Sequence, residues 1–204
     1  MKIVLASNNA GKLAELQTLF APLGMTLVRQ SELNIPEAAE PFKTFVENAL
    51  AKARHAAQLS GLPALADDAG LCVDAFGGQP GVDTAYYATR FGYPKGDDTN
   101  VSALLDQMQG LTNRRAAMVS TLVAVRSADD PEPLVAVGRV VVQITPERRG
   151  SNGFGFDPVM FLPEFGKTFA ELPPEVKNAH SHRGRAAQAM LALMRERWLD
   201  SAAS

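Results

Sequence analysis

Cysteine and histidine are scarce in this chain of 204 residues, which contains one cysteine, Cys72, and three histidines. A single cysteine cannot form an intrachain disulfide, so we expect a protein of a reducing, cytoplasmic compartment. Cys72 lies in an apolar run, which favours a buried and inert thiol over a nucleophile. One cysteine and three scattered histidines also do not supply the clustered ligands of a structural zinc site.

Charge of one sign is not in excess, and long apolar runs are missing. The 20 lysine and arginine residues nearly balance the 22 aspartate and glutamate residues, so the formal net charge is -2. Proteins that bind polynucleotides usually show a basic excess or stripe, so we expect no polynucleotide partner. No stretch approaches the ~18 apolar residues of a membrane helix, and the apolar run 1–6 is too short for a signal peptide. We therefore expect no membrane association.

What the sequence does contain is an alternation of strand-like and helix-like segments. Helices are predicted at residues 13–20, 44–60, 100–109 and 184–198, and strands at 2–6, 25–28, 64–67, 71–75, 116–125 and 134–144. The strongest helix begins after Thr44, which fits a capping box with Glu47, and the Gly- and Pro-rich residues 77–98 are predicted to be an irregular loop. This order predicts an α/β protein with a mixed sheet, as one domain over residues 1–204.

The segment at 7–12, Ser-Asn-Asn-Ala-Gly-Lys, lies between the first strand and the first helix. Such a junction presents free main-chain N–H groups and the positive end of a helix dipole, which suit a phosphate group. Ser7 and Asn9 add hydrogen-bond donors and Lys12 adds a charge. Taken alone, the segment fits a capping turn with a solvated lysine slightly better.

Carboxylates from two separate segments are candidate Mg²⁺ ligands. Glu40 lies in a polar stretch, and Asp67 and Asp68 follow a predicted strand. Mg²⁺ is commonly held by one or two carboxylates together with water and substrate phosphate. Successive strand residues point to opposite faces, so Asp67 and Asp68 are not expected to serve one site unless the strand ends between them. An Asp-Gly turn is the alternative.

Two further polar segments are candidates for binding. Asn48, Lys52 and His55 lie on one face of the predicted helix at 44–60, where a solvated face is the alternative. Lys177 and the residues at 181–183 gather donors and cations before the last helix, where a capping turn is the alternative.

The glycine-rich segment at 150–158 contains two phenylalanines and an aspartate. Glycines let the main chain approach a ligand closely, and an aromatic ring such as that of Phe154 can stack on a purine. Asp157 can accept a hydrogen bond from a base edge. A glycine-rich turn with core phenylalanines fits equally well.

Taken together, the segments resemble the inosine/xanthosine triphosphate pyrophosphatase family. The resembling stretches are SNNAGK at 7–12, TFVENALAKA at 44–53, ADDAGL at 66–71, GGQPGV at 77–82, GFGFDP at 153–158 and SHRG at 181–184. Each stretch alone is only a weak indicator of the family. Six of them, in the family's order and spread over nearly the whole chain, indicate it specifically. The resemblance implies an elongated mixed sheet with flanking helices, two lobes with the active cleft between them, and a homodimer.

The resemblance also implies roles for individual residues. It makes Asp68 the general base, and Glu40 and Asp68 the ligands of Mg²⁺. Substrate contacts are expected from Ser7, Asn8, Asn9, Ala10, Gly11, Lys12, Lys52, Ala69, Phe154, Gly155, Phe156, Asp157, Lys177, His182 and Arg183. Many relatives carry serine where this chain has Ala69, so any role of position 69 must come from its main chain.

The expected reaction is hydrolysis of ITP, dITP or XTP to the nucleoside monophosphate and pyrophosphate. Lys177, His182 and Arg183 would donate to the 6-keto oxygen of the purine, whereas adenine offers a 6-amino donor there and leaves these donors unpaired. Two alternatives stay open: a Maf-like pyrophosphatase of other specificity, and a non-catalytic nucleotide-binding protein, which would not need both carboxylates.

Overall fold

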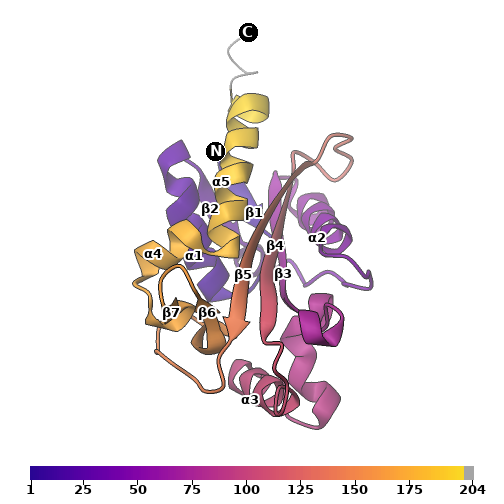
Figure 1. Cartoon of the computed structure of the whole chain (residues 1–204). Coiled ribbons are helices and arrows are strands. Elements are labelled where there is room, and N and C mark those ends of the chain that lie inside the picture. The colour runs from indigo at the N-terminus through magenta and orange to yellow at the C-terminus, as the bar shows by residue number, and fades with distance from the viewer. Residues whose placement is uncertain (200–204) are drawn as a thin grey trace. The chain divides into compact units, whose positions relative to one another are not determined.

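The computed structural model describes residues 1–199 and contains a seven-stranded sheet in the order β2-β1-β3-β4-β5-β6-β7. The strands are β1 (Lys2–Leu5), β2 (Thr26–Arg29), β3 (Ala64–Val73), β4 (Arg115–Val125), β5 (Leu134–Ile144), β6 (Met160–Leu162) and β7 (Lys167–Thr168). β1 is parallel to β2 and β3, whereas β6 is antiparallel to β5 and β7. The prediction of an α/β protein with a mixed sheet is confirmed (Figure 1).

Five α-helices accompany these strands in the described residues. They are α1 (Ala10–Phe20), α2 (Phe45–Ser60), α3 (Asp97–Gln107), α4 (Pro174–His180) and α5 (His182–Met194), which continues as a π-helical turn over Arg195–Leu199. Thr44 caps α2 as predicted, because its hydroxyl accepts from the N–H of Glu47 at 3.4 Å and donates to that residue's carboxylate at 2.5 Å. No helix within residues 1–199 has the length and apolar character needed to cross a bilayer.

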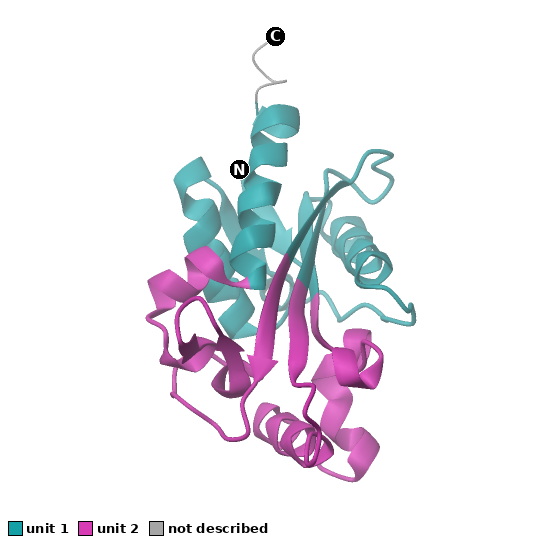
Figure 2. Cartoon of the chain, viewed as in Figure 1, with its two compact units in different colours: residues 1–68, 120–138, 182–204 teal, residues 69–119, 139–181 magenta. Residues whose placement is uncertain are grey.

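The chain divides into two compact units. The first unit comprises residues 1–68, 120–138 and 182 onward, and the second comprises residues 69–119 and 139–181 (Figure 2). β3, β4 and β5 each contribute residues to both units. Each unit has its own hydrophobic core.

In the first unit, successive strand residues face two different helical layers. Ile3 and Leu5 of β1 pack in a cluster with α1 and α5, whereas Val4 packs in a second cluster with the alanines of α2. Figure 1 places α1 and α5 on one side of these strands and α2 on the other. The alternation follows from the period of two along a strand, and strands covered on both faces are apolar throughout. The same alternation decides where polar residues of β3 point.

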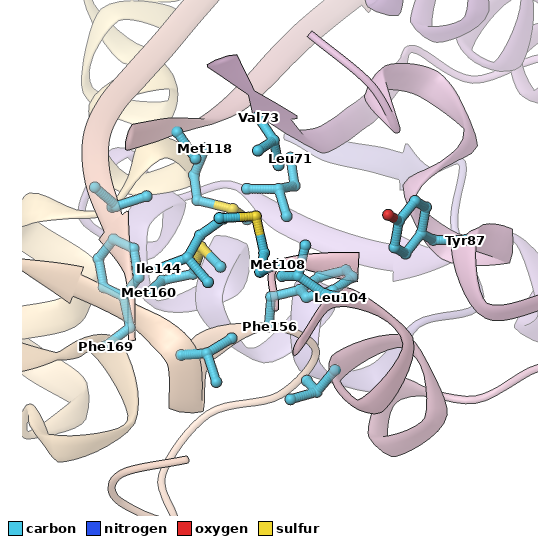
Figure 3. Packing of buried hydrophobic residues seen from close by; sticks show 14 of the residues in the cluster. Leu71, Val73, Tyr87, Leu104, Met108, Met118, Ile144, Phe156, Met160 and Phe169 are labelled. Atoms are coloured by element: carbon cyan, nitrogen blue, oxygen red, sulfur yellow. The ribbon is translucent and has the colours of Figure 1, made fainter. Parts of the chain in front are cut away.

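The core of the second unit gathers large side chains from strands, helices and loops. Leu71, Met108, Met118 and Ile144 pack together with Phe156 (Figure 3). Phe156 belongs to the glycine-rich segment that was expected to contact a ligand, but its side chain lies in this core and the residue is 5% exposed. Any contact of Phe156 with a ligand must therefore come from its main chain.

Several predicted boundaries differ from the structure. The two strands predicted at 64–67 and 71–75 form one strand, β3, because both aspartates find lysine partners and need no turn. Residues 77–98 are not wholly irregular, since 3-10 helical turns, η4, span Gly81–Phe91. The helix predicted at 100–109 begins at Asp97, where acidic residues favour a helix N-terminus. The last helix begins at His182 rather than near 184.

Candidate active site

The segment that follows β1 starts α1 with a side-chain cap. Asn9 is the N-cap residue, and its Oδ1 accepts from the N–H of Lys12 at 3.0 Å. The Ser7 hydroxyl accepts from the N–H of Asn9 at 3.2 Å, and the Asn8 amide donates to Glu37 at 3.1 Å. The capping alternative is therefore right for Asn9, while the first turn of α1 still carries Lys12 toward β3.

Asp67 lies at the centre of a buried ionic group, which we call the Asp67 group. Its carboxylate is 3.0 Å from Nζ of Lys12 and 2.9 Å from Nε of Arg183, and it accepts from the hydroxyl of Ser120 at 2.7 Å. Nη1 of Arg183 lies 2.7 Å from the carboxylate of Glu15. The Asp67 side chain is 0% exposed, so this carboxylate depends on its partners for stability.

The pKa values of Asp67 and Lys12 are both lowered, for different reasons. Burial alone would raise the pKa of Asp67, but Lys12, Arg183 and the Ser120 hydroxyl outweigh it and hold that pKa well below its usual range. Burial lowers the pKa of Lys12, and the nearby Arg183 and Lys52 cations add to this effect, while Asp67 opposes it. Asp67 therefore stays ionised across the neutral range.

Arg183 reaches Asp67 because the N-terminus of α5 lies close to β5. A Cβ atom added to Gly138 of β5 would lie 1.9 Å from the carbonyl oxygen of His182 and 2.5 Å from the N of Ala186. No other residue has room at position 138 without movement of the helix. The first turn of α5, with the buried residues His182 and Arg183, is thus held against this strand.

A second ionic group, the Glu40–Lys52–Asp68 group, lies beside the first. Nζ of Lys52 is 2.9 Å from Oε2 of Glu40 and 2.9 Å from Oδ1 of Asp68. Burial raises the pKa of Asp68, with a further rise from Glu40, although Lys52 opposes both effects. Burial would lower the pKa of Lys52, but the two carboxylates raise it above its ordinary value. The Lys52 ammonium therefore partly neutralises the negative charges of Glu40 and Asp68, which are far apart in sequence.

The main-chain carbonyl of Asp67 joins the two groups. It accepts from Nζ of Lys12 at 3.3 Å and from Nζ of Lys52 at 3.1 Å. Because β3 does not end between Asp67 and Asp68, the two side chains diverge as expected and meet different lysines. In the Glu40–Lys52–Asp68 group, two carboxylates share one ammonium, and this excess of negative charge favours an added cation.

Asp68 has the character of a ligand for a hard cation. Its Oδ2 is buried and has no hydrogen-bond partner within the described residues, whereas Oδ1 is bound to Lys52. Between residues 1 and 199 there is no cluster of three or more His, Cys, Asp or Glu side chains with metal-binding geometry. Two carboxylates nevertheless suit Mg²⁺, which fills its remaining positions with water and phosphate oxygens.

In the second unit, the glycine-rich segment forms a group around Asp157. Nζ of Lys177 lies 2.6 Å from Oδ2 of Asp157, which also accepts from the N–H of Phe154 at 2.9 Å. The same ammonium lies 4.8 Å from the centroid of the Phe154 ring. Gly153 has a φ of 77°, and an added Cβ would lie 2.0 Å from Oδ2 of Asp157, so glycine is required there.

In the glycine-rich segment at 150–158, here called the Phe154 segment, the Phe154 ring lies beside the buried ammonium of Lys177 from α4, an arrangement that suits a flat, polar ring system. An anchor outside the segment also holds it, because the carboxylate of Asp97 accepts from the N–H of Gly155 at 3.1 Å. Asp157 and Lys177 are each 4% exposed, so the ion pair between them is largely shielded from water.

The sequence model of the Ham1 family matches residues 3–193. This chain belongs to the Ham1 family. Among curated relatives, a protein of Paracidovorax citrulli named dITP/XTP pyrophosphatase is 79% identical over 198 residues, which cover 97% of this chain and 100% of the relative.

Solved structures of the family agree with the fold. A HAM1 protein from Coxiella burnetii has a TM-score of 0.87 and 40% sequence identity, with 96% of this chain and 99% of that chain covered. A crystal structure from Mycobacterium abscessus, described as a nucleoside-triphosphatase / dITP/XTP pyrophosphatase, has a TM-score of 0.72 and 39% identity over 96% of this chain and 100% of that one. The resemblance drawn from the six sequence segments is thus confirmed.

The geometry of this Ham1 protein brings several of the expected site residues together within each unit. Lys12, Lys52, Glu40 and Asp68 lie within two adjoining groups, and Phe154, Asp157 and Lys177 lie in another. Ala69 is a partly exposed strand residue next to Asp68, and Ala10 and Gly11 begin α1. Arg183, which is expected to read the purine edge, binds Asp67 and Glu15.

Sequence reasoning singled out Asp67 but missed its pairing with Arg183 and Ser120, and it missed Glu15. These partners are distant in sequence, since Arg183 is 116 residues from Asp67 and 168 residues from Glu15. One signal was present: two aspartates lie in an apolar strand, and a buried carboxylate requires a cationic partner. Nothing in the sequence identifies which cation that is.

Proposed function

We propose that this chain hydrolyses the aberrant purine nucleoside triphosphates ITP, dITP and XTP to the nucleoside monophosphate and pyrophosphate, and that it requires Mg²⁺. The observation that carries the proposal is the convergence of Glu40 and Asp68 on Lys52, with the second oxygen of Asp68 buried and unpartnered within the described chain. The name dITP/XTP pyrophosphatase of a relative that is 79% identical supports the same substrates.

The charge balance explains why a divalent cation is needed. In the Glu40–Lys52–Asp68 group, two carboxylates share one ammonium, so a triphosphate placed beside them would meet an excess of negative charge. A site of that kind repels a polyanion unless a cation is added. When bound by Glu40 and Asp68, Mg²⁺ supplies the missing positive charge and lowers the pKa of a bound water.

The side chains of this chain then have distinct tasks. Asp68 accepts the proton of the attacking water, a role that suits a carboxyl whose pKa is raised by burial. Lys12 and Lys52 donate to phosphate oxygens and offset the charge that develops on them. Ser7 and the main-chain N–H groups at the start of α1 hold the phosphate chain at the helix N-terminus.

The base is assigned to the Phe154 segment. The Phe154 ring stacks on the purine, and Lys177 donates to its 6-keto oxygen, with Asp157 holding the ammonium in place. For Arg183 we propose a different task from reading the base, because its Nε and Nη1 already bind Asp67 and Glu15. In the Asp67 group, Arg183 holds the Asp67 carboxylate in place, and this carboxylate orients Lys12.

Pyrophosphate release from ITP, measured with and without Mg²⁺ and in competition with ATP, tests the proposal. We expect pyrophosphate rather than inorganic phosphate, no turnover without a divalent cation, and a strong preference for ITP. Equal rates with ITP and ATP would exclude the purine pocket. Binding of ITP without turnover at any Mg²⁺ concentration would favour the non-catalytic alternative.

A further inference from the structure

The segment that carries Glu40 has no regular secondary structure and lies along α2. Residues 35–42 form neither helix nor strand. Three side chains from one face of α2 contact this segment in reverse order: Asn48 binds Phe42, Lys52 binds Glu40, and a ring nitrogen of His55 lies 3.0 Å from the carbonyl oxygen of Pro36. The stripe that the sequence suggested on this helix therefore holds a loop.

Asn48 makes the most complete of these contacts. Its Oδ1 accepts from the N–H of Phe42 at 3.0 Å, and its Nδ2 donates to the carbonyl oxygen of Phe42 at 3.2 Å. The residue is only 1% exposed, so the two bonds are shielded from water. The amide thus satisfies both main-chain polar groups of one loop residue, as a neighbouring strand would.

Such an anchor has a consequence for Glu40, two residues away. The Glu40 side chain is 46% exposed, so packing does little to fix it, and its position depends on the course of the main chain. A loop residue that is not tied down must lose conformational freedom whenever its side chain binds a ligand. An anchor at Phe42 removes part of that cost before the ligand arrives.

We propose that Asn48 is a positioning residue, which holds Phe42 so that Glu40 stays beside Lys52 and Asp68 and within reach of the divalent cation. This inference rests on the proposed function, since it takes Glu40 as a metal ligand. Both polar atoms of the buried Asn48 side chain are taken up by Phe42, so we assign it no contact with metal or substrate. Its effect is therefore expected on the Mg²⁺ requirement rather than on the rate at saturating Mg²⁺.

A matched control exists elsewhere in the chain. Asn100 of α3 is 2% exposed and makes the same pair of bonds to η4, because its Oδ1 accepts from the N–H of Ala88 at 2.8 Å and its Nδ2 donates to the carbonyl of Ala85 at 3.2 Å. Asn48→Leu and Asn100→Leu therefore remove equivalent bonds at similar cost to stability, and only the first releases the Glu40 segment.

The experiment is a Mg²⁺ titration of pyrophosphate release from ITP by the full chain and both variants. Asn48→Leu should raise the Mg²⁺ concentration for half-maximal rate about tenfold or more, as loss of an outer-shell partner does at other metal sites, with kcat at saturating Mg²⁺ little changed. Asn100→Leu should lower the Tm comparably and leave the Mg²⁺ requirement unchanged. An equal Mg²⁺ requirement in both variants would overturn the proposal.

Two additional measurements keep the test decisive. In metal-free protein, hydrogen exchange over residues 36–42 should be faster in Asn48→Leu than in the parent chain, and unchanged exchange would count against the anchor. If Asn48→Leu does not fold, Asn48→Asp keeps the acceptor for the Phe42 N–H and loses the donor. Its added negative charge would by itself lower the Mg²⁺ requirement, so a rise reports the lost bond.

Glu40→Gln separates the inference from the function on which it rests. If Glu40→Gln raises the Mg²⁺ requirement and Asn48→Leu does not, Glu40 is a ligand and Asn48 does not position it. If neither variant changes the requirement, the assignment of Glu40 to the metal fails as well.

Discussion

Nζ of Lys52 lies 2.9 Å from Oδ1 of Asp68, and yet the pKa of Asp68 is raised rather than lowered. Burial of the carboxyl and the nearby negative charge of Glu40 outweigh the attraction of the ammonium. A carboxyl in this setting is a stronger base than one in water, while Lys52 keeps it oriented. In the proposed reaction, Asp68 would act as the general base and Lys52 would fix its direction.

The first prediction concerns Asp68 directly. Asp68→Asn should lower kcat for ITP by about 10²–10⁴-fold, because an amide cannot accept the proton of the attacking water. The Tm and the circular dichroism spectrum should stay close to those of the parent chain. Asp74→Asn, which changes a carboxylate paired with Arg115 at 2.9 Å outside the proposed site, is the control and should keep full activity. Parental turnover in Asp68→Asn would remove the assignment.

The second prediction concerns the pH dependence of stability. The folded protein lowers the pKa of Asp67, so this group contributes stability above the unfolded pKa of about 4 and loses it as the pH falls further. Asp67→Asn should lower the free energy of unfolding near neutral pH by about 3–5 kcal/mol, because Lys12 and Arg183 lose their shared counter-charge.

Below about pH 4, the parent chain should lose stability more steeply than Asp67→Asn, by up to ~1.4 kcal/mol per pH unit for the one proton involved. Urea unfolding at a series of pH values measures both curves. If the two curves ran parallel through the acid range, Asp67 would not be held ionised by its partners.

The third prediction uses two glycines of one loop. Gly153 and Gly155 both have positive φ, but a Cβ at 153 would lie 2.0 Å from Oδ2 of Asp157, whereas a Cβ at 155 meets nothing within 4 Å. Gly155→Ala should therefore show only the cost of backbone strain, about 1–2 kcal/mol. Gly153→Ala should in addition displace Asp157 and Lys177 and raise KM for ITP. Steady-state kinetics of the two variants, side by side, measures the difference, and equal KM values would contradict it.

The fourth prediction concerns purine selectivity. Replacing Lys177 by methionine together with Asp157→Asn removes the proposed donor without leaving a buried, unpaired carboxylate. The ratio of kcat/KM for ITP to that for ATP should fall about tenfold, since one buried donor is worth roughly 1–3 kcal/mol of discrimination. Lys167→Met changes an exposed lysine of β7 and serves as the control. An unchanged ratio in the double variant would place selectivity elsewhere.

Local patterns allowed much of the fold to be predicted from the sequence. Thr44 and Glu47 marked the start of α2, and the β-branched runs gave β4 and β5 with nearly correct ends. The break predicted near Gly70 was wrong because turn-forming residues can remain in a strand when their charges are neutralised. Lys12 and Lys52 provide that neutralisation for Asp67 and Asp68, and neither lysine is near them in sequence.

The sequence by itself determined the mixed α/β architecture, the family and the residue types available for phosphate and metal, because strand and helix periods and short motifs are local properties of the chain. Only the tertiary structure decided which charge meets which: that Arg183 pairs with Asp67 and Glu15, that Lys177 pairs with Asp157, and that Asn48 ties down Phe42. Ion pairs and hydrogen bonds act over a few ångströms, so they depend on how distant segments pack, and no spacing along the chain records that.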